Sequence, residues 1–326
     1  MENNRLKYIQ LTRVCAMCMI LLCHAFNENK NFNFLGQIFN VGVFTFLFLS
    51  GYLYGPKYIK NDKEWLLKRL KKILIPMWLF MVFIFAVRFF LLGYGIEFKS
   101  YIVYLFNMQG LLRGVQGATH LWFMTTIMIC YLITPLLYKI KKMVLYIDKR
   151  IIFIIIPLII SIQYIVAYLT SENIALQISY ITLYIFAYYF SCIWDKQLER
   201  KKFYLITILT FCIVFVRLIS KIFFDGTLLY NVLIVTYSQS ILGIWIFLFF
   251  YYFTNNRNEK IYFKLINNLD KLSFEIYIVH YMFFVGPLRV MNISNNFFVN
   301  SFSAFILSYI FAIILNKVCQ RLIKNN

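Results

Sequence analysis

Residues 8–26 read YIQLTRVCAMCMILLCHAF, a predominantly apolar run that can form one membrane-spanning helix. An α-helix rises about 1.5 Å per residue and the hydrocarbon core of a bilayer is about 30 Å thick, so roughly twenty apolar residues suffice for one crossing. Similar runs recur along the chain and give the set 8–26, 34–55, 73–93, 119–138, 151–169, 174–194, 203–223, 228–253, 272–290 and 297–317. The pattern predicts an all-α, polytopic transmembrane helix bundle of about ten spans.

The composition agrees with a membrane protein rather than a soluble one. Hydrophobic residues make up 62% of the 326 residues and aromatic residues 20%, whereas about half of a soluble domain is apolar. No polar stretch is long enough for a soluble domain, so we predict a single integral-membrane domain over residues 1–326.

Two polar stretches interrupt the apolar pattern most. Residues 57–72 place Trp65 and three leucines among lysines, which predicts a short amphipathic helix on the inner membrane surface. Residues 94–118 include Gly110, Gly114 and Gly117 and are expected to face outward. They form either a loop that dips back over the bundle or, as we prefer, a simple flexible connection.

The distribution of positive charge sets the expected orientation. The net charge of +20 would suggest nucleic acid for a soluble protein, but 25 Lys and Arg residues fall on one side of the predicted spans and only four on the other. By the positive-inside rule, both termini are expected in the cytoplasm. Anionic lipid headgroups explain the basic loops without a nucleic-acid partner, and we expect a multi-pass protein of the plasma, or inner, membrane.

The seven cysteines all lie within the predicted spans or near their ends. Cys15 and Cys18 have the spacing of a redox or metal pair, but the sequence has no second pair and no histidine cluster at ligand spacing. We therefore expect no metal site and interpret the cysteines as small apolar residues.

Only three histidines occur, His24, His120 and His280, and each lies inside or at the edge of an apolar run. A polar ring costs free energy in hydrocarbon unless it is satisfied, so ionisable groups in spans suggest a functional site. The alternative is that each histidine bridges two helices by hydrogen bonds.

Arg13 and His24 are eleven residues apart, about three helical turns, and so lie on nearly the same face. A cation at one end of this face and a base at the other would suit a channel that holds an anion from the cytoplasm. Alternatively, Arg13 extends to a lipid phosphate and His24 marks the outer interface.

Arg69 and Lys72 share one face at the cytoplasmic mouth of the third span. Two cations there could grip a phosphate-rich ligand, with the planar arginine fork accepting two oxygens. The ordinary positive-inside distribution explains them equally well.

The ninth run has a polar face of its own, because Ser273, Tyr277 and His280 recur at intervals of four and three residues. Glu275 is expected to point elsewhere. In the second run, the Ser50-Gly51 pair favours close contact with another helix. An interfacial aromatic belt explains Trp122 but not its neighbour His120.

In order along the chain, these segments resemble the integral-membrane acyltransferase 3 family over almost the whole length. The matching pieces are Arg13 with His24, FLSGYL at 48–53, Arg69 to Lys72 before Pro76, HLWFM at 120–124 and SFEIYIVH at 273–280. Two positions depart from the family pattern. The acidic residue often found just before the first arginine is absent from residues 10–12, and the second arginine of the R-x-x-R pattern is Lys72.

The resemblance implies transfer of an acyl group, commonly acetyl, from cytoplasmic acyl-coenzyme A to a cell-surface glycan or related acceptor. It also implies that His24 is the catalytic candidate and that Arg13, Arg69 and Lys72 belong to the site.

We therefore predict a membrane O-acyltransferase of exopolysaccharide or capsule modification, with acetyl-coenzyme A as donor. A neutral His24 would act as general base, His120 or Tyr277 would orient the acceptor or the developing oxyanion, and His280 would support the site. Expected partners are membrane lipid, the glycan, and either a second copy or a polysaccharide-biosynthesis protein.

The alternative is a glycan or lipid-linked sugar exporter or flippase, in which the same residues line a transport path. A membrane sensor would need a signalling domain that the sequence lacks.

Overall fold

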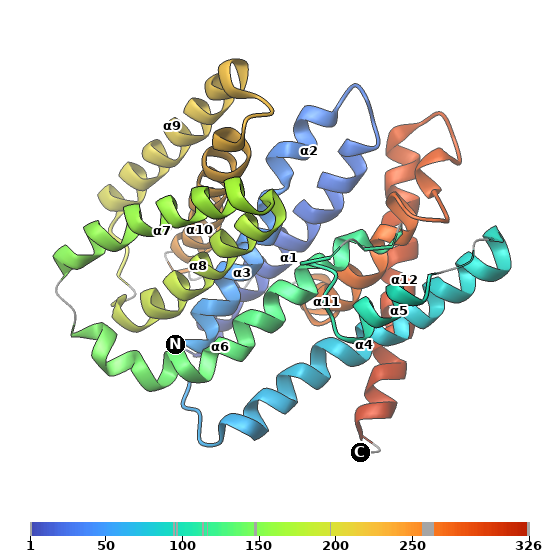
Figure 1. Cartoon of the computed structure of the whole chain (residues 1–326), viewed down its shortest axis with the longest axis horizontal. Helices are drawn as coiled ribbons and strands as arrows, with labels where there is room; N and C mark the ends of the chain where they lie inside the picture. The colour runs from blue at the N-terminus through green and yellow to red at the C-terminus, as the bar shows by residue number, and fades with distance from the viewer. Residues whose placement is uncertain are drawn as a thin grey trace. The chain divides into compact units, whose positions relative to one another are not determined.

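All regular structure in the described part of the chain is helical, as Figure 1 shows. The computed structural model describes residues 2–93, 95, 97–112, 114–115, 117–146, 149–195, 197–255 and 264–324. The helices are α1 (Glu2–Asn27), α2 (Asn33–Phe39), α3 (Val41–Tyr54), α4 (Asp62–Leu92), α5 (Phe98–Leu105), α6 (Trp122–Leu145), α7 (Lys149–Leu169), α8 (Glu172–Ile193), α9 (Arg200–Phe224), α10 (Val235–Asn255), α11 (Lys264–Phe284) and α12 (Phe297–Lys324). Short helical turns are η1 (Thr119–Leu121), η2 (Leu229–Ile234) and η3 (Val290–Asn292). The all-α prediction is confirmed.

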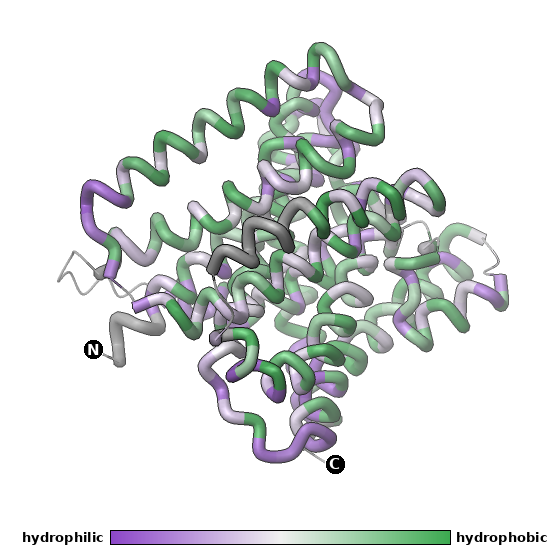
Figure 2. Tube along the Cα trace, turned by 60° about the vertical axis from the view of Figure 1, so that its left-hand side comes forward, coloured by the Kyte–Doolittle hydropathy of each residue, from purple (hydrophilic) through white to green (hydrophobic). Residues whose placement is uncertain are grey.

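Within the residues that the structure describes, eight helical segments are long and apolar enough to cross a membrane. They are Lys7–Asn27, Asn33–Tyr54, Asp62–Leu92, Thr119–Val144, Ile174–Ile193, Arg200–Phe224, Leu229–Thr254 and Phe297–Leu322. Hydrophobic residues run along most of these helices and hydrophilic residues gather near their ends and in the loops, as Figure 2 shows. The fifth predicted run lies on α7 and the ninth on α11, so the count of ten spans and the cytoplasmic placement of both termini stay predictions.

The chain forms two compact units. The first comprises Met1–Thr12, Val43–Asp62 and Ile129–Lys260. Within it α7 packs on α8 and α9 on α10. A side chain at Gly51 would collide with the Tyr184 carbonyl of α8, so the predicted close helix contact at this glycine is confirmed. Apolar side chains such as Ile208 and Phe215 of α9 are more than 60% exposed, as expected of a helix that faces lipid.

The second unit comprises Arg13–Gly42, Lys63–Met128 and Ile261–Asn326. Within it α11 packs on α12. It holds every residue that the sequence analysis placed in the site, so the site can be described within this unit alone.

Residues 57–72 do not form a separate amphipathic helix, contrary to the prediction. The helix begins at Asp62 and continues without interruption to Leu92, a length of about 46 Å at 1.5 Å per residue. Pro76 lies inside it and has no N–H to donate to the Lys72 carbonyl. The polar segment is therefore the first part of the span-forming helix α4.

The preferred prediction for residues 94–118, a flexible connection, is also wrong. Besides the short helix α5, it contains Asn107 and Gln109, which are at most 4% exposed. The Asn107 amide donates to the Met124 carbonyl at 3.0 Å, and that of Gln109 to the Leu121 carbonyl at 2.9 Å. These amides pair with carbonyls of η1 and of the first turn of α6, which explains why the segment is held against them.

Tyr104 of α5 fixes the second half of the same segment. Its hydroxyl accepts from the Val115 N–H at 2.8 Å and donates to the Ala118 carbonyl at 3.3 Å. Burial raises the pKa of Tyr104 to about 12, so the hydroxyl keeps its proton near neutral pH. It therefore remains a donor and orders the chain directly before η1.

Candidate active site

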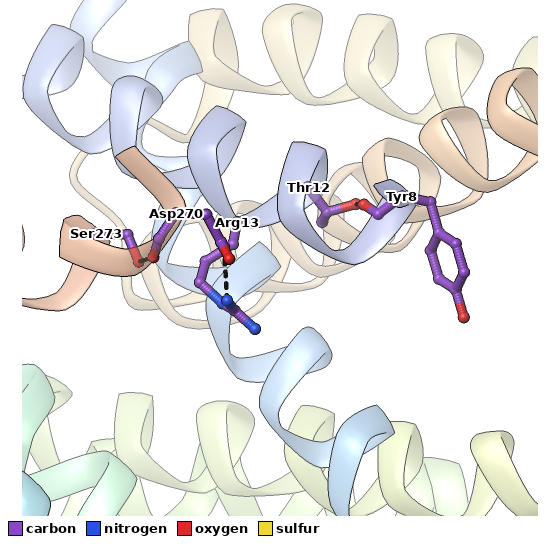
Figure 3. A network of polar contacts seen from close by, with 5 residues as sticks. All are labelled: Tyr8, Thr12, Arg13, Asp270 and Ser273. Atoms are coloured by element: carbon purple, nitrogen blue, oxygen red, sulfur yellow. Dashed lines mark hydrogen bonds and ion pairs between the residues drawn. The ribbon is translucent and has the colours of Figure 1, made fainter. Parts of the chain in front are cut away.

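Helices α1 and α11 lie side by side and meet at two levels. At one level the Arg13 guanidinium of α1 donates to the Asp270 carboxylate of α11 at 2.5 Å, as Figure 3 shows. At the other level the rings of His24 and His280 lie 5.2 Å apart. Eleven residues separate Arg13 from His24 and ten separate Asp270 from His280, so the two helices run in the same direction. The levels are therefore about 15 Å apart along the helix axes.

At the first level the structure brings together the three predicted cofactor-binding residues. Lys72 of α4 lies within electrostatic range of Arg69 and Arg13, and also of the carboxylates of Asp270 and Glu275. We call Arg13, Arg69 and Lys72 the cation group. Its three positive charges face two carboxylates, which leaves an excess of positive charge for an anionic ligand.

Glu275 lies within electrostatic range of Lys72 at this level, and its predicted orientation away from the face of Ser273, Tyr277 and His280 stays a prediction. Its Oε2 atom is buried and has no hydrogen-bond partner among the described residues, although Lys72 interacts with it electrostatically. The hydroxyl of Ser273 donates to the backbone carbonyl of Asp270 at 2.9 Å within α11 (Figure 3). Ser273 is therefore engaged by its own helix. On α4, the Arg69 guanidinium lies over the Trp65 ring, 5.6 Å from its centre, which orients the fork by a cation–π contact.

At the second level the three histidines meet although α1, η1 and α11 are far apart in sequence. The rings of His120 and His280 are 5.1 Å apart, and those of His24 and His280 are 5.2 Å apart. Tyr281 stacks on His120 at 4.7 Å and meets His24 edge-on at 4.9 Å. We call His24, His120 and His280 the histidine cluster.

Backbone carbonyls determine which ring nitrogens carry protons in two of these histidines. His120 Nε2 lies 2.9 Å from the Ile278 carbonyl and His280 Nδ1 lies 2.6 Å from the Tyr277 carbonyl. A carbonyl only accepts, so each of these nitrogens donates and the other ring nitrogen of a neutral imidazole carries a lone pair. Those other nitrogens, His120 Nδ1 and His280 Nε2, are buried and have no hydrogen-bond partner within the described part of the chain.

Two unpaired buried acceptors are costly unless a donor fills the space beside them. A hydroxyl group supplies such a donor, and so does a water molecule. The histidine cluster thus offers nitrogen lone pairs to a hydroxyl proton, which is the requirement for a general base.

Tyr277 holds the cluster together. Its hydroxyl donates to the His120 backbone carbonyl at 2.5 Å, and its side chain is 3% exposed. Because the hydroxyl proton is committed to this bond, Tyr277 fixes η1 against α11. Its predicted role in orienting an acceptor or an oxyanion stays a prediction.

A family model described as an acyltransferase domain matches residues 6–317, which include both levels of this site. The chain belongs to the acyltransferase 3 family. The resemblance found in the sequence is thereby confirmed, and this acyltransferase 3 protein is a multi-pass membrane acyltransferase. No curated protein and no solved structure shows significant similarity to the chain.

Two residues at the site of this acyltransferase 3 protein were not found from the sequence. Asp270 supplies a carboxylate beside Arg13, which residues 10–12 of α1 do not provide. It lies seven residues before Tyr277, a spacing of about two turns that keeps it on the same face. Tyr281 follows Tyr277 by four residues and so shares that face as well. Extending the periodic pattern in both directions along 270–281 could have found both.

Proposed function

We propose that this protein transfers an acyl group, acetyl in the first instance, from acyl-coenzyme A to a hydroxyl of a cell-surface or exopolysaccharide glycan. One observation carries the proposal. Helices α1 and α11 meet at two levels about 15 Å apart along their axes. The pair Arg13–Asp270 stands at the level of the cation group, and the pair His24–His280 stands at the level of the histidine cluster.

The donor binds through its phosphates at the cation group. Arg13 and Arg69 offer planar forks for phosphate oxygens, and Lys72 adds a compact positive charge. The distribution of basic residues along the chain supports a cytoplasmic position for this level. The long flexible arm of coenzyme A then extends along α1 and α11 and brings the thioester to the histidine cluster.

The acceptor hydroxyl reacts at the histidine cluster. A neutral His24 takes the hydroxyl proton as the oxygen attacks the thioester carbonyl carbon, so a C–O bond forms and the C–S bond breaks. The departing sulfur receives the proton that the histidine held, which leaves coenzyme A as the free thiol. Tyr281, in contact with both His24 and His120, keeps the rings in place.

The cellular setting follows from this chemistry. A donor made in the cytoplasm and an acceptor at the cell surface require the protein to sit in the plasma, or inner, membrane. Delivery of the glycan requires a polysaccharide-biosynthesis protein nearby, and a second copy of this chain is an alternative partner.

The test uses the full chain purified in detergent or lipid nanodiscs with radiolabelled acetyl-coenzyme A. We expect free thiol to appear and label to move to a polysaccharide fraction, at a rate that depends on that fraction. An exporter would leave acetyl-coenzyme A unconsumed, and this result would contradict the proposal. Mass and proton spectra of surface glycan from cells with and without the gene would then identify the modified sugar.

A further inference from the structure

A small polar pocket lies where α1 ends, one helical turn past His24 along the chain. Its volume is about 200 Å³, and its lining includes Glu28, Asn29, Lys30, Ser294, Asn295 and Phe297. All six belong to the second unit. The volume is below the 300–1,000 Å³ that is usual for drug-sized ligands, so the pocket suits a ligand no larger than about one sugar ring.

The pocket is close to the proposed base. Glu28 follows His24 by four residues, and its N–H donates to the His24 carbonyl at 3.3 Å. Four residues correspond to one helical turn, or about 6 Å along the axis. A ligand held here can present a neighbouring group to His24, on the side away from Arg13.

One wall of the pocket is preformed by Asn300, which is 3% exposed. Its amide nitrogen donates to the carbonyls of Met291 and Ser294, both at 2.7 Å, and its oxygen accepts from the Ser294 hydroxyl at 2.7 Å. These bonds fix the loop before α12 that carries Asn295. The polar groups therefore need little rearrangement to bind.

An aromatic ring forms another part of the lining. Phe297 stacks on Phe26 of α1 with 5.5 Å between the ring centres and lies 5.7 Å from Phe32. These contacts immobilise the Phe297 ring. The pocket thus combines an aromatic surface with amide, hydroxyl and charged groups.

The charge of the pocket distinguishes it from the donor level. Glu28 and Lys30 carry opposite charges and the other polar lining groups are neutral, whereas the cation group has excess positive charge. A phosphate therefore has no net attraction here. Ring hydroxyls both donate and accept hydrogen bonds, and so suit a mixture of carboxylate, ammonium, amide and hydroxyl groups.

We propose that this pocket is the acceptor subsite and binds one sugar ring of the glycan, with the reacting hydroxyl directed toward His24. The inference rests on the proposed function and adds the location at which the acceptor is recognised. Asn295 and Glu28 hydrogen-bond ring hydroxyls, and Phe297 contacts the apolar face of the ring.

The first test measures binding without catalysis. A panel of methyl hexosides and methyl N-acetylhexosaminides is added to the purified full chain, and saturation-transfer NMR detects the bound sugar. Glu28→Gln and Asn295→Ala are on different segments, so each can be interpreted alone. The matched control is Asn33→Ala, because Asn33 is exposed near the same end of α1 and is absent from the pocket lining.

We expect the wild-type chain and Asn33→Ala to bind at least one sugar, with at least a fivefold loss of affinity in each pocket variant. Binding of acetyl-coenzyme A is expected to be unchanged in all of them. Equal sugar affinity in the control and both pocket variants would overturn the inference, as would the absence of sugar binding to the wild type.

The second test separates this inference from the proposed function. In the transfer assay, the pocket variants are expected to raise the KM for the sugar and leave the kcat near that of Asn33→Ala. If the wild type binds sugar at the pocket but never consumes acetyl-coenzyme A, the proposed function fails and the sugar site stands. If acetyl-coenzyme A is consumed and the KM for sugar is unchanged in both variants, the pocket is not the acceptor subsite.

Discussion

Asp270 of α11 accepts a hydrogen bond from Arg13 of α1 with 2.5 Å between nitrogen and oxygen, across 257 positions of sequence. The Arg13 side chain is 28% exposed and that of Asp270 is 10% exposed, so water screens the pair only partly. The ion pair joins the two helices that carry His24 and His280. Its loss is therefore expected to affect both stability and the alignment of the site.

Replacing Asp270 with Asn is expected to destabilise the protein. The amide keeps a hydrogen-bond acceptor but removes the countercharge from Arg13, and leaving a charged group poorly paired costs about 1–3 kcal/mol. A thermal unfolding series in detergent measures this as a lower midpoint.

The control is Glu64→Gln on α4, which breaks a pair with Lys68 whose side chains are 63% and 71% exposed. Exposed pairs of this kind contribute little, so no measurable change is expected. Equal midpoints for the two variants would show that the Arg13–Asp270 pair does not hold α1 and α11 together.

The sequence was sufficient for features that depend on local periodicity. Apolar runs predicted the helices, and the intervals between Ser273, Tyr277 and His280 predicted a polar face on α11 that the structure shows to be buried. Helical geometry alone places residues three, four and seven positions apart on one face. The same geometry predicted that Arg13 and His24 mark two levels of α1.

Contacts between distant segments were not predictable in this way. Nothing local indicates that Asp270 reaches Arg13 or that His120 meets His280, since helix packing decides both. Asn107 and Gln109 were missed for a different reason. Polar residues between glycines are typical of a loop, but here their amides pair with carbonyls of η1 and α6 and become buried.

Arg69 and Lys72 are expected to bind the phosphates of acyl-coenzyme A. Replacing either with Ala removes a charge-assisted contact worth about 1.5–3 kcal/mol, so the affinity should fall more than tenfold. Lys72→Arg keeps the charge and adds a fork, and is expected to bind at least as well as the wild type. Calorimetry with the detergent-purified protein gives the dissociation constants.

Lys71→Ala provides the control for this series, because it removes an equal charge from the same helix at an exposed position. Its affinity for acyl-coenzyme A is expected to match the wild type. If Arg69→Ala, Lys72→Ala and Lys71→Ala all have the same affinity for acyl-coenzyme A, Arg69 and Lys72 do not bind it. Their charges would then reflect only the positive-inside distribution.

Gly110 is expected to be essential for the close packing of the segment before η1 against α6. A Cβ at this position would lie 2.7 Å from the Trp122 carbonyl oxygen and 2.8 Å from Thr125 Cβ. Gly110→Ala should therefore lower the free energy of unfolding by about 1–3 kcal/mol, as overpacking does elsewhere. Gly95→Ala is the control, because a Cβ added at Gly95 would have no atom of another described residue within 4 Å. Thermal midpoints that fall equally in both would contradict the close packing at Gly110.

The two ends of α4 are expected on opposite sides of the membrane. Lys63 lies in the first turn of α4. Lys99 lies in α5, the helix that follows the end of α4 at Leu92. The positive-inside distribution places residue 63 in the cytoplasm. Single cysteines at these positions, in a background without the native cysteines, should react with an impermeant thiol reagent in intact cells at 99 but not at 63. Labelling at 63 and protection at 99 would reverse the proposed orientation.

His24 is expected to act as the base. Its ring contacts His280 and Tyr281, and its position about 16 Å above Arg13 on α1 matches a donor bound at the cation group. His24→Ala should abolish glycan acylation with acyl-coenzyme A binding nearly intact, since losing a general base typically costs about 10²–10⁴ in rate.

Alanine alone cannot separate the role of His24 as a base from a role in bridging helices, because it removes both. His24→Gln keeps hydrogen bonding but has no basic nitrogen near neutral pH, so it should be as inactive as His24→Ala if His24 is the base. A stably folded His24→Gln protein that acylates glycan at a near-normal rate would transfer the role to His120 or His280, each of which has a buried ring nitrogen with no hydrogen-bond partner among the described residues.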